Sequence, residues 1–306
     1  MNRPRTQAGA AGLLVVVQVL FGVHYFAAKI VLAEIPPLAW AGLRVAAAAL
    51  FLLPLAFLIS GRRAVPRPAD LARLAGLSLL GVVINQWAFV EGLSRTSITH
   101  SALINTGIPV LTLIFAVLMR QERANPGKLA SIFLAMLGVL VLLRVDSMVL
   151  DRATRGDLIT LINATSFSLF LVLSRPLLTR LDPLMATGFL FAFGSLVLLP
   201  LGAPLWLRIS PSTLQPATWL WGAFVVLGAT VVAYSLNYLA LRRMESSVVA
   251  LFILLQPLLA ASADVWVMGS KWTLRLSAAT VLIGAGVVCA LLAGRRRAVT
   301  PLPRGG

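Results

Sequence analysis

The second half of the chain repeats the first half, and both copies are strongly apolar. The segment PPLAWAGLRVAAAALFLLPL at residues 36–55 aligns with DPLMATGFLFAFGSLVLLPL at residues 182–201, an offset of 146 residues. Farther along, the offset becomes 148 and pairs Gly138 with Gly286. A two-residue difference in one loop explains the change. Because both halves must fold alike, the repeat constrains the architecture before any single motif does.

Composition places this repeat in a membrane. Hydrophobic residues make up 59% of the 306 residues and charged residues only 12%, which argues against a soluble globular protein. An apolar run of roughly 20 residues can cross a hydrocarbon core about 30 Å thick. The sequence holds ten such runs, centred near residues 21, 47, 82, 108, 135, 167, 194, 228, 257 and 283. It predicts an all-α integral membrane protein with ten transmembrane helices.

Five spans in each half would insert the second half upside down relative to the first. The sequence therefore predicts two inverted five-helix repeats, which is typical of transporters that open a central cavity alternately to either side. We expect the first repeat at 11–144, a linker at 145–156, the second repeat at 157–293 and a basic cytoplasmic tail at 294–306.

The distribution of positive charge predicts the orientation. The formal net charge is +16, and most of the 26 lysines and arginines fall in segments that share one side if the N-terminus is cytoplasmic. This asymmetry follows the positive-inside rule with both termini cytoplasmic. Because the charges are scattered along one rim and not clustered, we expect no nucleic-acid partner.

The sequence contains few residues of the types that form enzymatic or metal sites. Cys289 is the only cysteine, so the chain can form neither an internal disulfide nor a CxxC metal site. HExxH and GxSxG motifs are absent, and His24 and His100 are the only histidines. Ser101 beside His100 would point away from it on a helix. We expect no enzyme activity, no metal and no cofactor.

Arg44 is the strongest candidate for a substrate-binding residue. It lies about eight residues into the second predicted span, roughly 12 Å deep at 1.5 Å per residue. An arginine at that depth must face a cavity or a partner, because exposure to lipid is costly. Its planar guanidinium suits a carboxylate or a phosphate. A structural pairing with an acidic residue or with helix carbonyls is an equal alternative.

Two further polar residues break the symmetry of the repeat. His24 aligns with Phe170, and Asp264 aligns with Ala116. The predicted topology puts both at the depth of Arg44, as one polar pocket requires. His24 is a candidate substrate contact, with a hydrogen-bonded filler as the alternative. Asp264 is a candidate for coupling to a proton or other ion, with a hydrated helix end as the alternative.

The remaining candidates are polar or aromatic. Asn105 and Gln256 lie within four residues of Pro109 and Pro257, which free backbone carbonyls that must face protein or a wet cavity. Any one of the uncharged residues could instead bridge two helices, and any one of the aromatic residues could instead pack between helices. The full set comprises substrate-binding candidates Arg44, His24, Asn85, Asn105, Gln256, Trp87 and Tyr234, and coupling candidates Asp264 and Glu91.

Several motifs resemble a known family. FGVHYFAAK (21–29) is similar to its opening helix with a terminal Lys29, and SALINTGIPVLTLIFAVLMRQER (101–123) is similar to its fourth-helix signature with Glu122. Over residues 11–293 the chain resembles EamA-type members of the drug/metabolite transporter superfamily. Ser270 stands where the second repeat of that family has an acidic residue. On physical grounds we expect Glu122 to form an ion pair with a neighbouring loop, and Lys29 and its aligned residue Arg175 to anchor helix ends at an interface.

The resemblance implies a function. Such proteins are multi-pass proteins of the bacterial inner membrane that move amino acids, other small metabolites or drugs, driven by an ion gradient. Arg44 favours a carboxylate-bearing substrate. We expect a secondary transporter in the lipid bilayer, an exporter acting as a monomer or homodimer. A lipid or lipid-linked-sugar translocase, with Arg44 as headgroup site, is the main alternative, and a drug efflux pump is another.

Overall fold

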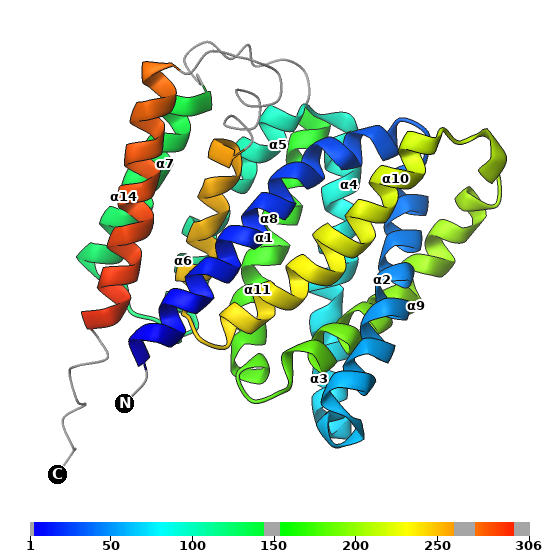
Figure 1. Cartoon of the computed structure of the whole chain (residues 1–306), viewed down its shortest axis with the longest axis horizontal. Helices are drawn as coiled ribbons and strands as arrows, with labels where there is room; N and C mark the ends of the chain where they lie inside the picture. The colour runs from blue at the N-terminus through cyan, green and yellow to red at the C-terminus, as the bar shows by residue number, and fades with distance from the viewer. Residues whose placement is uncertain (1–2, 144–153, 260–272, 297–306) are drawn as a thin grey trace.

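The computed structural model describes residues 3–143, 154–259 and 273–296, and the secondary structure of these residues is entirely helical. Figure 1 shows the helices as one bundle. Asp264 and most of the predicted linker lie outside the described residues.

The described helices of the two halves follow the same order. The first half contains α1 (Arg3–Leu32), α2 (Pro37–Ser60), η1 (Arg62–Ala64), α3 (Pro68–Ser78), η2 (Leu79–Ile84), α4 (Asn85–Arg95), α5 (Ile98–Asn105), α6 (Ile108–Leu118) and α7 (Pro126–Leu143). The second half contains α8 (Thr154–Leu178), α9 (Pro183–Trp206), η4 (Pro211–Thr213), α10 (Pro216–Val226), η5 (Leu227–Val232), α11 (Ala233–Leu241), α12 (Ser246–Leu251), η6 (Phe252–Leu254) and α14 (Leu274–Arg296).

The lengths and surfaces of these helices suit a membrane. Seven described helical segments are long and apolar enough to cross a bilayer, and Pro126–Gly138, Ser246–Leu259 and Ser277–Ala290 are shorter apolar helices. Large apolar side chains such as Leu58 and Leu207 are exposed on the outer surface of the bundle. A protein surrounded by lipid can expose such residues without cost, so the chain is a multi-pass membrane protein. The exact count of ten spans and the cytoplasmic termini stay predictions.

Proline positions explain the change of offset in the repeat. Proline is favoured at the first helical position because its missing N–H has no partner there in any case. α2 and α9 begin at Pro37 and Pro183, 146 residues apart, whereas α3 and α10 begin at Pro68 and Pro216, 148 residues apart. The extra two residues therefore lie in the connection that follows α9.

Both halves contain a π-helical turn at the equivalent place. η2 (Leu79–Ile84) separates α3 from α4, and η5 (Leu227–Val232) separates α10 from α11 at the offset of 148. π-helical turns are rare and frequently mark functional sites. Their recurrence shows that the repeat preserves an irregularity as well as regular helices.

α2 and α9 pack against each other through reciprocal close contacts. A Cβ atom on Gly42 would lie 2.6 Å from the carbonyl oxygen of Leu198, and one on Gly188 would lie 3.0 Å from Leu53. Because Gly42 aligns with Gly188 and Leu53 with Leu199, the two contacts are equivalent within the repeat. The helices run antiparallel, because Gly42 near the start of α2 meets Leu198 near the end of α9, and Leu53 near the end of α2 meets Gly188 near the start of α9.

α7 and α14 meet in the same way at the other side of the bundle. A Cβ on Gly138 would lie 3.0 Å from the backbone nitrogen of Ile283, and one on Gly286 would lie 2.8 Å from that of Ala135. These pairs are again equivalent, at the offset of 148. Reciprocal contacts of this kind are what an approximate twofold axis produces. In Figure 1 the α7–α14 pair lies at the left and the α2–α9 pair at the right.

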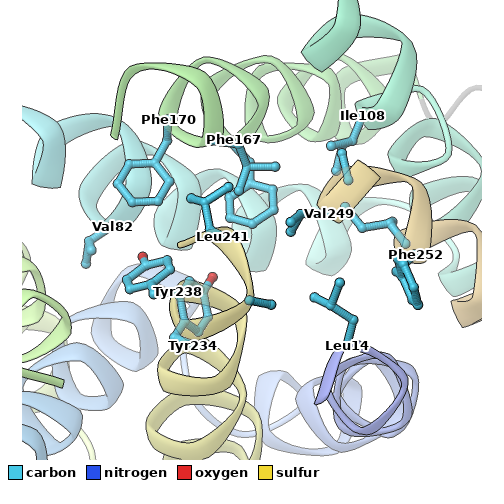
Figure 2. Packing of buried hydrophobic residues seen from close by; sticks show 14 of the residues in the cluster. Leu14, Val82, Ile108, Phe167, Phe170, Tyr234, Tyr238, Leu241, Val249 and Phe252 are labelled. Atoms are coloured by element: carbon cyan, nitrogen blue, oxygen red, sulfur yellow. The ribbon is translucent and has the colours of Figure 1, made fainter. Parts of the chain in front are cut away.

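The core between these two pairs draws on both halves. Figure 2 shows Val82 from the first half beside Phe170, Tyr234 and Tyr238 from the second half. The rings of Phe170 and Tyr238 lie 5.5 Å apart, and those of Tyr234 and Tyr238 lie 5.9 Å apart. These aromatic residues belong to the core, and Tyr234 also reaches the central region in which the polar residues gather.

We predict that Gly42→Ala destabilises the bundle whereas Gly76→Ala does not. The added methyl at Gly42 would meet backbone atoms of α9, and overpacking of this kind costs about 1–3 kcal/mol. A Cβ at Gly76 meets nothing within 4 Å, so that substitution brings only the higher helix propensity of alanine. Thermal unfolding midpoints of both variants in the same detergent test this prediction, and equal midpoints would contradict it.

Candidate functional site

A cavity lies at the centre of the bundle and is lined by both halves. It offers about 60 Å³ to the centres of water-sized molecules. This space suffices for a few waters, since one water needs roughly 10–15 Å³ on that measure. The lining residues are Phe21, His24, Tyr25, Arg44, Asn85, Gln86, Phe89, Asn105, Ile108, Asn163, Phe167, Tyr234, Ile253 and Gln256.

Most residues selected from the sequence meet at this cavity, although they come from distant parts of the chain. They lie on α1, α2, α4, α5 and α11 and after η6. The residues that the structure brings together in this way are His24, Arg44, Asn85, Asn105, Tyr234 and Gln256.

Three selected residues are not part of the described lining. Trp87 packs against the hydrophobic core beside the cavity. Glu91 accepts a hydrogen bond from Arg95 Nε at 2.6 Å, one helical turn later, near the end of α4. Asp264 lies outside the described residues.

Arg44 is a buried cation with unused hydrogen-bonding capacity. It is 1% exposed, and its Nε donates to Thr230 Oγ1 at 2.7 Å. Its Nη1 is buried without a hydrogen-bond partner among the described atoms, and within the described ranges Arg44 forms no ion pair. A buried charge without a counterion is costly, so the arrangement favours an anion in the cavity.

Thr230 connects Arg44 to the π-helical turn η5. Its hydroxyl donates to the carbonyl oxygen of Val225, five residues earlier, at 2.7 Å. Arg44 and Thr230 come from different halves, and their equivalents are Leu190 and Val82, both buried in the apolar core. The polar contact between the halves is therefore formed by only one of the two equivalent pairs of positions.

A second polar group lies where the two halves meet. Gln86 and Tyr234 are equivalent positions at the offset of 148, and Gln86 Nε2 donates to Tyr234 Oη at 2.5 Å. Tyr234 Oη donates in turn to Asn85 Oδ1 at 3.0 Å. Gln86 Oε1 is buried and lacks a partner among the described atoms, so it remains free to accept a hydrogen bond from a ligand.

His24 and Asn105 each add one buried polar atom that lacks a hydrogen-bond partner among the described atoms. His24 stacks on Phe89 with ring centroids 4.9 Å apart, and its Nε2 has no partner among the described atoms. Asn105 Nδ2 donates to Tyr25 Oη at 2.6 Å, which leaves Asn105 Oδ1 without one. Buried polar groups are nearly always satisfied in native proteins. Together with Arg44 and Gln86, these atoms define a cavity that requires water or a polar ligand.

Some lining residues were not selected from the sequence. Tyr25 and Phe89 were not among the selected residues, because nothing in the sequence places them beside His24. Asn163 could have been found, since it aligns with Val17 and so breaks the symmetry as His24 does. The same holds for Thr230, the partner of Arg44 outside the lining, which aligns with Val82. Asn163 Nδ2 donates to the Asn85 carbonyl at 2.9 Å and fixes α8 against α4.

Lys29 and Arg175 form equivalent contacts that differ from the expected interface anchoring. Lys29 Nζ donates to the Thr96 carbonyl at 2.8 Å, and Arg175 Nε donates to the Met244 carbonyl at 3.0 Å. Thr96 and Met244 are themselves equivalent. Lys29 therefore ties α1 to the connection between α4 and α5. Arg175 ties α8 to the equivalent connection between α11 and α12.

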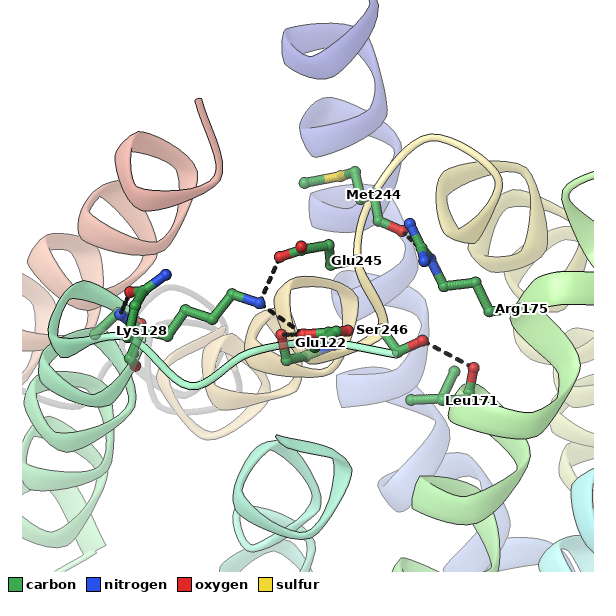
Figure 3. A network of polar contacts seen from close by, with 10 residues as sticks. Glu122, Lys128, Leu171, Arg175, Met244, Glu245 and Ser246 are labelled. Carbon is green, nitrogen blue, oxygen red and sulfur yellow. Dashed lines mark hydrogen bonds and ion pairs between the residues drawn. The ribbon is translucent and has the colours of Figure 1, made fainter. Parts of the chain in front are cut away.

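Glu122 is the centre of a buried ion network near Arg175, shown in Figure 3. Lys128 Nζ lies 2.7 Å from Glu122 Oε2 and 2.5 Å from Glu245 Oε2. The backbone N–H and the hydroxyl of Ser247 both donate to the Glu122 carboxylate, which therefore caps the N-terminus of α12. Glu122 forms an ion pair as expected, but its partner Lys128 lies on α7 and not in a loop. The network connects α7 with the second half.

The chain is similar to known proteins over most of its length. A sequence profile of the EamA-like transporter family matches residues 9–144 and again 154–292. An uncharacterized transporter of Archaeoglobus fulgidus is 26% identical over 262 residues, which cover 85% of this chain and 89% of the relative. The uncharacterized transporter YetK of Bacillus subtilis is 24% identical over 83% of this chain and 78% of its own. One crystal structure superposes with a TM-score of 0.76 at 19% identity, covering 95% of this chain and 99% of that chain, and shows the shared fold.

We predict that Thr230→Val destabilises the protein. The substitution keeps the shape of the side chain but leaves Arg44 Nε buried without its acceptor, which costs about 1–3 kcal/mol. Thr187→Val is the matched control, because that buried hydroxyl donates to the Pro183 carbonyl within its own helix. Thermal unfolding in detergent should show the larger drop for Thr230→Val. A similar drop for both variants would exclude a special role for the Arg44 contact.

We also predict that Glu122→Gln destabilises the protein far more than Glu91→Gln. Removing one partner of a buried ion pair costs up to about 3–5 kcal/mol. Glu122→Gln leaves buried Lys128 with Glu245 as its partner and also weakens the hydrogen bonds from Ser247. The partly exposed Glu91–Arg95 pair is an i,i+4 contact worth about 0.3–0.5 kcal/mol. Urea titration of the two purified variants measures the difference, and comparable midpoints would refute the assignment.

Proposed function

Because the chain belongs to the EamA-like transporter family, we propose that it is a secondary transporter of small carboxylate-bearing metabolites such as amino acids. The proposed mechanism is alternating access around the central cavity, with Arg44 as the anchor of the substrate carboxylate. We propose export as the direction and the inner membrane of a bacterium as the location, with both termini cytoplasmic.

The buried guanidinium of Arg44 is the observation that carries this proposal. Its Nε is held by Thr230, while its Nη1 has no partner among the described atoms. Arginine binds carboxylates in a planar fork, and a charge-assisted hydrogen bond is about twice as strong as a neutral one. A substrate carboxylate would supply both the counterion and the missing acceptor.

The other partnerless atoms favour an amino acid over a simple carboxylic acid. Gln86 Oε1 and Asn105 Oδ1 are amide oxygens and can only accept hydrogen bonds. An ammonium group is a donor with three hydrogens and no acceptor, so it complements these oxygens. A zwitterion with both groups would satisfy opposite kinds of polar atom in the same cavity.

The size of the cavity supports a closed conformation. Space for a few waters does not admit an amino acid, so the walls must move apart before substrate enters. Equivalent helices of the two halves run antiparallel, and antiparallel equivalents that cross a bilayer are related by an axis in the membrane plane. Inverted repeats of this kind can exchange conformations and so open the cavity to one side at a time.

The equivalent contacts of Lys29 and Arg175 suit the two gates of such a cycle. In inverted repeats, the ends of α1 and α8 lie on opposite faces of the membrane. The Lys29–Thr96 contact would then close one face and the Arg175–Met244 contact the other. Coupling to a proton or another ion is assigned to Asp264 in this proposal, because Glu91 already pairs with Arg95.

Counterflow of labelled amino acids in proteoliposomes tests the proposal. Wild-type protein should exchange at least one amino acid, and Arg44→Ala should abolish the exchange while the protein still inserts and folds. Arg44→Lys keeps the charge but loses the planar fork, so we expect about a tenfold or greater loss, equivalent to about 1.4 kcal/mol of binding. Arg95→Ala, at the exposed end of α4, is the matched control.

Each other outcome has a definite meaning. Wild-type exchange in Arg44→Ala would remove Arg44 from the substrate site. Absence of exchange for every amino acid, with neutral metabolites, drugs or lipids transported instead, would reject the proposed substrate class. Loss of exchange in Arg95→Ala as well would show that the assay reports general damage to the fold.

A further inference from the structure

We propose that a groove between α3 and the end of α8 binds one anionic phospholipid, with its phosphate at Arg73 and Arg180. The groove is separate from the central cavity and shares no lining residue with it. The inference does not depend on what the protein transports.

The groove is large, open and mostly apolar. It offers about 490 Å³ to the centres of water-sized molecules, and leucines form its walls. Gly76 and Pro176 lie on its exposed side, and a Cβ at Gly76 would meet nothing within 4 Å. A groove that is open at the outer surface of a membrane protein faces lipid, so a lipid acyl chain can fill its apolar part.

The charged and apolar residues of the groove are ordered along its length. On α3, Arg73 is followed by Leu77 four residues later, and Leu80 follows at the start of η2; all three line the groove. On the facing segment, Arg180 is preceded by Leu177 and Leu173. Both arginines therefore lie at one end and the leucines extend from them, which matches a headgroup and its acyl chain.

The arginines have more positive charge than their shared carboxylate neutralises. Asp70 Oδ1 lies 2.9 Å from Arg180 Nη2 and 3.7 Å from Arg73 Nη1. Two guanidiniums and one carboxylate leave one net positive charge at the rim, and the arginine side chains are 64% and 53% exposed. A phosphodiester carries one negative charge and would balance this excess.

The predicted orientation brings anionic lipid to the same place. Arg73 and Arg180 belong to the basic segments that the positive-inside rule assigns to the cytoplasm. The cytoplasmic leaflet carries the anionic lipids of most membranes, and basic pockets between helices on that side bind their headgroups. The charge, the shape and the predicted membrane side of the groove thus all favour an anionic phospholipid.

Native mass spectrometry of delipidated protein with added phosphatidylglycerol or phosphatidylcholine tests the proposal. The wild type should bind one phosphatidylglycerol about tenfold more tightly than phosphatidylcholine. Arg73→Ala/Arg180→Ala should remove this preference, and Gly76→Leu, which fills the groove without altering its charge, should weaken binding of phosphatidylglycerol by a similar factor. Arg62→Ala/Arg63→Ala, which removes two exposed arginines outside the groove, should leave binding unchanged.

Several results would overturn the proposal. Equal binding of both lipids by the wild type would exclude an anionic headgroup site. Loss of binding in Arg62→Ala/Arg63→Ala would indicate general surface charge, and unchanged binding in Gly76→Leu would show that the groove does not hold the acyl chain. Displacement of the lipid by millimolar inorganic phosphate would assign the site to free phosphate. A homodimer that dissociates in Gly76→Leu would make the groove an interface between two copies.

Discussion

Close antiparallel packing of equivalent helices holds this protein together at both sides of the bundle. Gly42 and Gly188 bring α2 and α9 into backbone contact, and Gly138 and Gly286 do the same for α7 and α14. In lipid the hydrophobic effect does not drive helices together, so van der Waals packing between small residues takes its place. Because the two tight pairs lie on either side, the helices between them enclose the cavity.

Within this repeated framework, chemistry resides where the two halves differ. Arg44 and Thr230 form a polar contact whose equivalent is Leu190 with Val82. Leu190 and Val82 are buried and have no polar side-chain atom to satisfy, whereas Arg44 has a guanidinium hydrogen-bonded at one atom and without a partner among the described atoms at another. The symmetric positions thus maintain the fold, and the asymmetric positions give the cavity its polarity and its requirement for an anion.

Much of the fold could be predicted from the sequence, because the repeat and the helix-starting prolines are visible in it. Arg44 and His24 could be found because a polar residue inside an apolar span is conspicuous when its aligned partner is leucine or phenylalanine. Asn85 and Trp87 could not be told apart as lining residues, since residues 85 and 87 point in different directions and only the structure shows which face of α4 meets the cavity. The partners of these residues, such as Thr230 for Arg44 and Gln18 for Gln256, depend on helix adjacency, which the sequence does not contain.

The paired π-helical turns have a mechanical consequence. Each of η2 and η5 holds one residue more than an α-helical turn would need, directly before the cavity-lining residues Gln86 and Tyr234. If that extra residue were absorbed into the neighbouring connection, the following helix would rotate by about 100° around its axis, since an α-helix has 3.6 residues per turn. Such a rotation would turn Gln86 or Tyr234 away from its present contacts without breaking a helix. Each half thus carries, next to the cavity, a place where a change of helix register would alter the residues that line it.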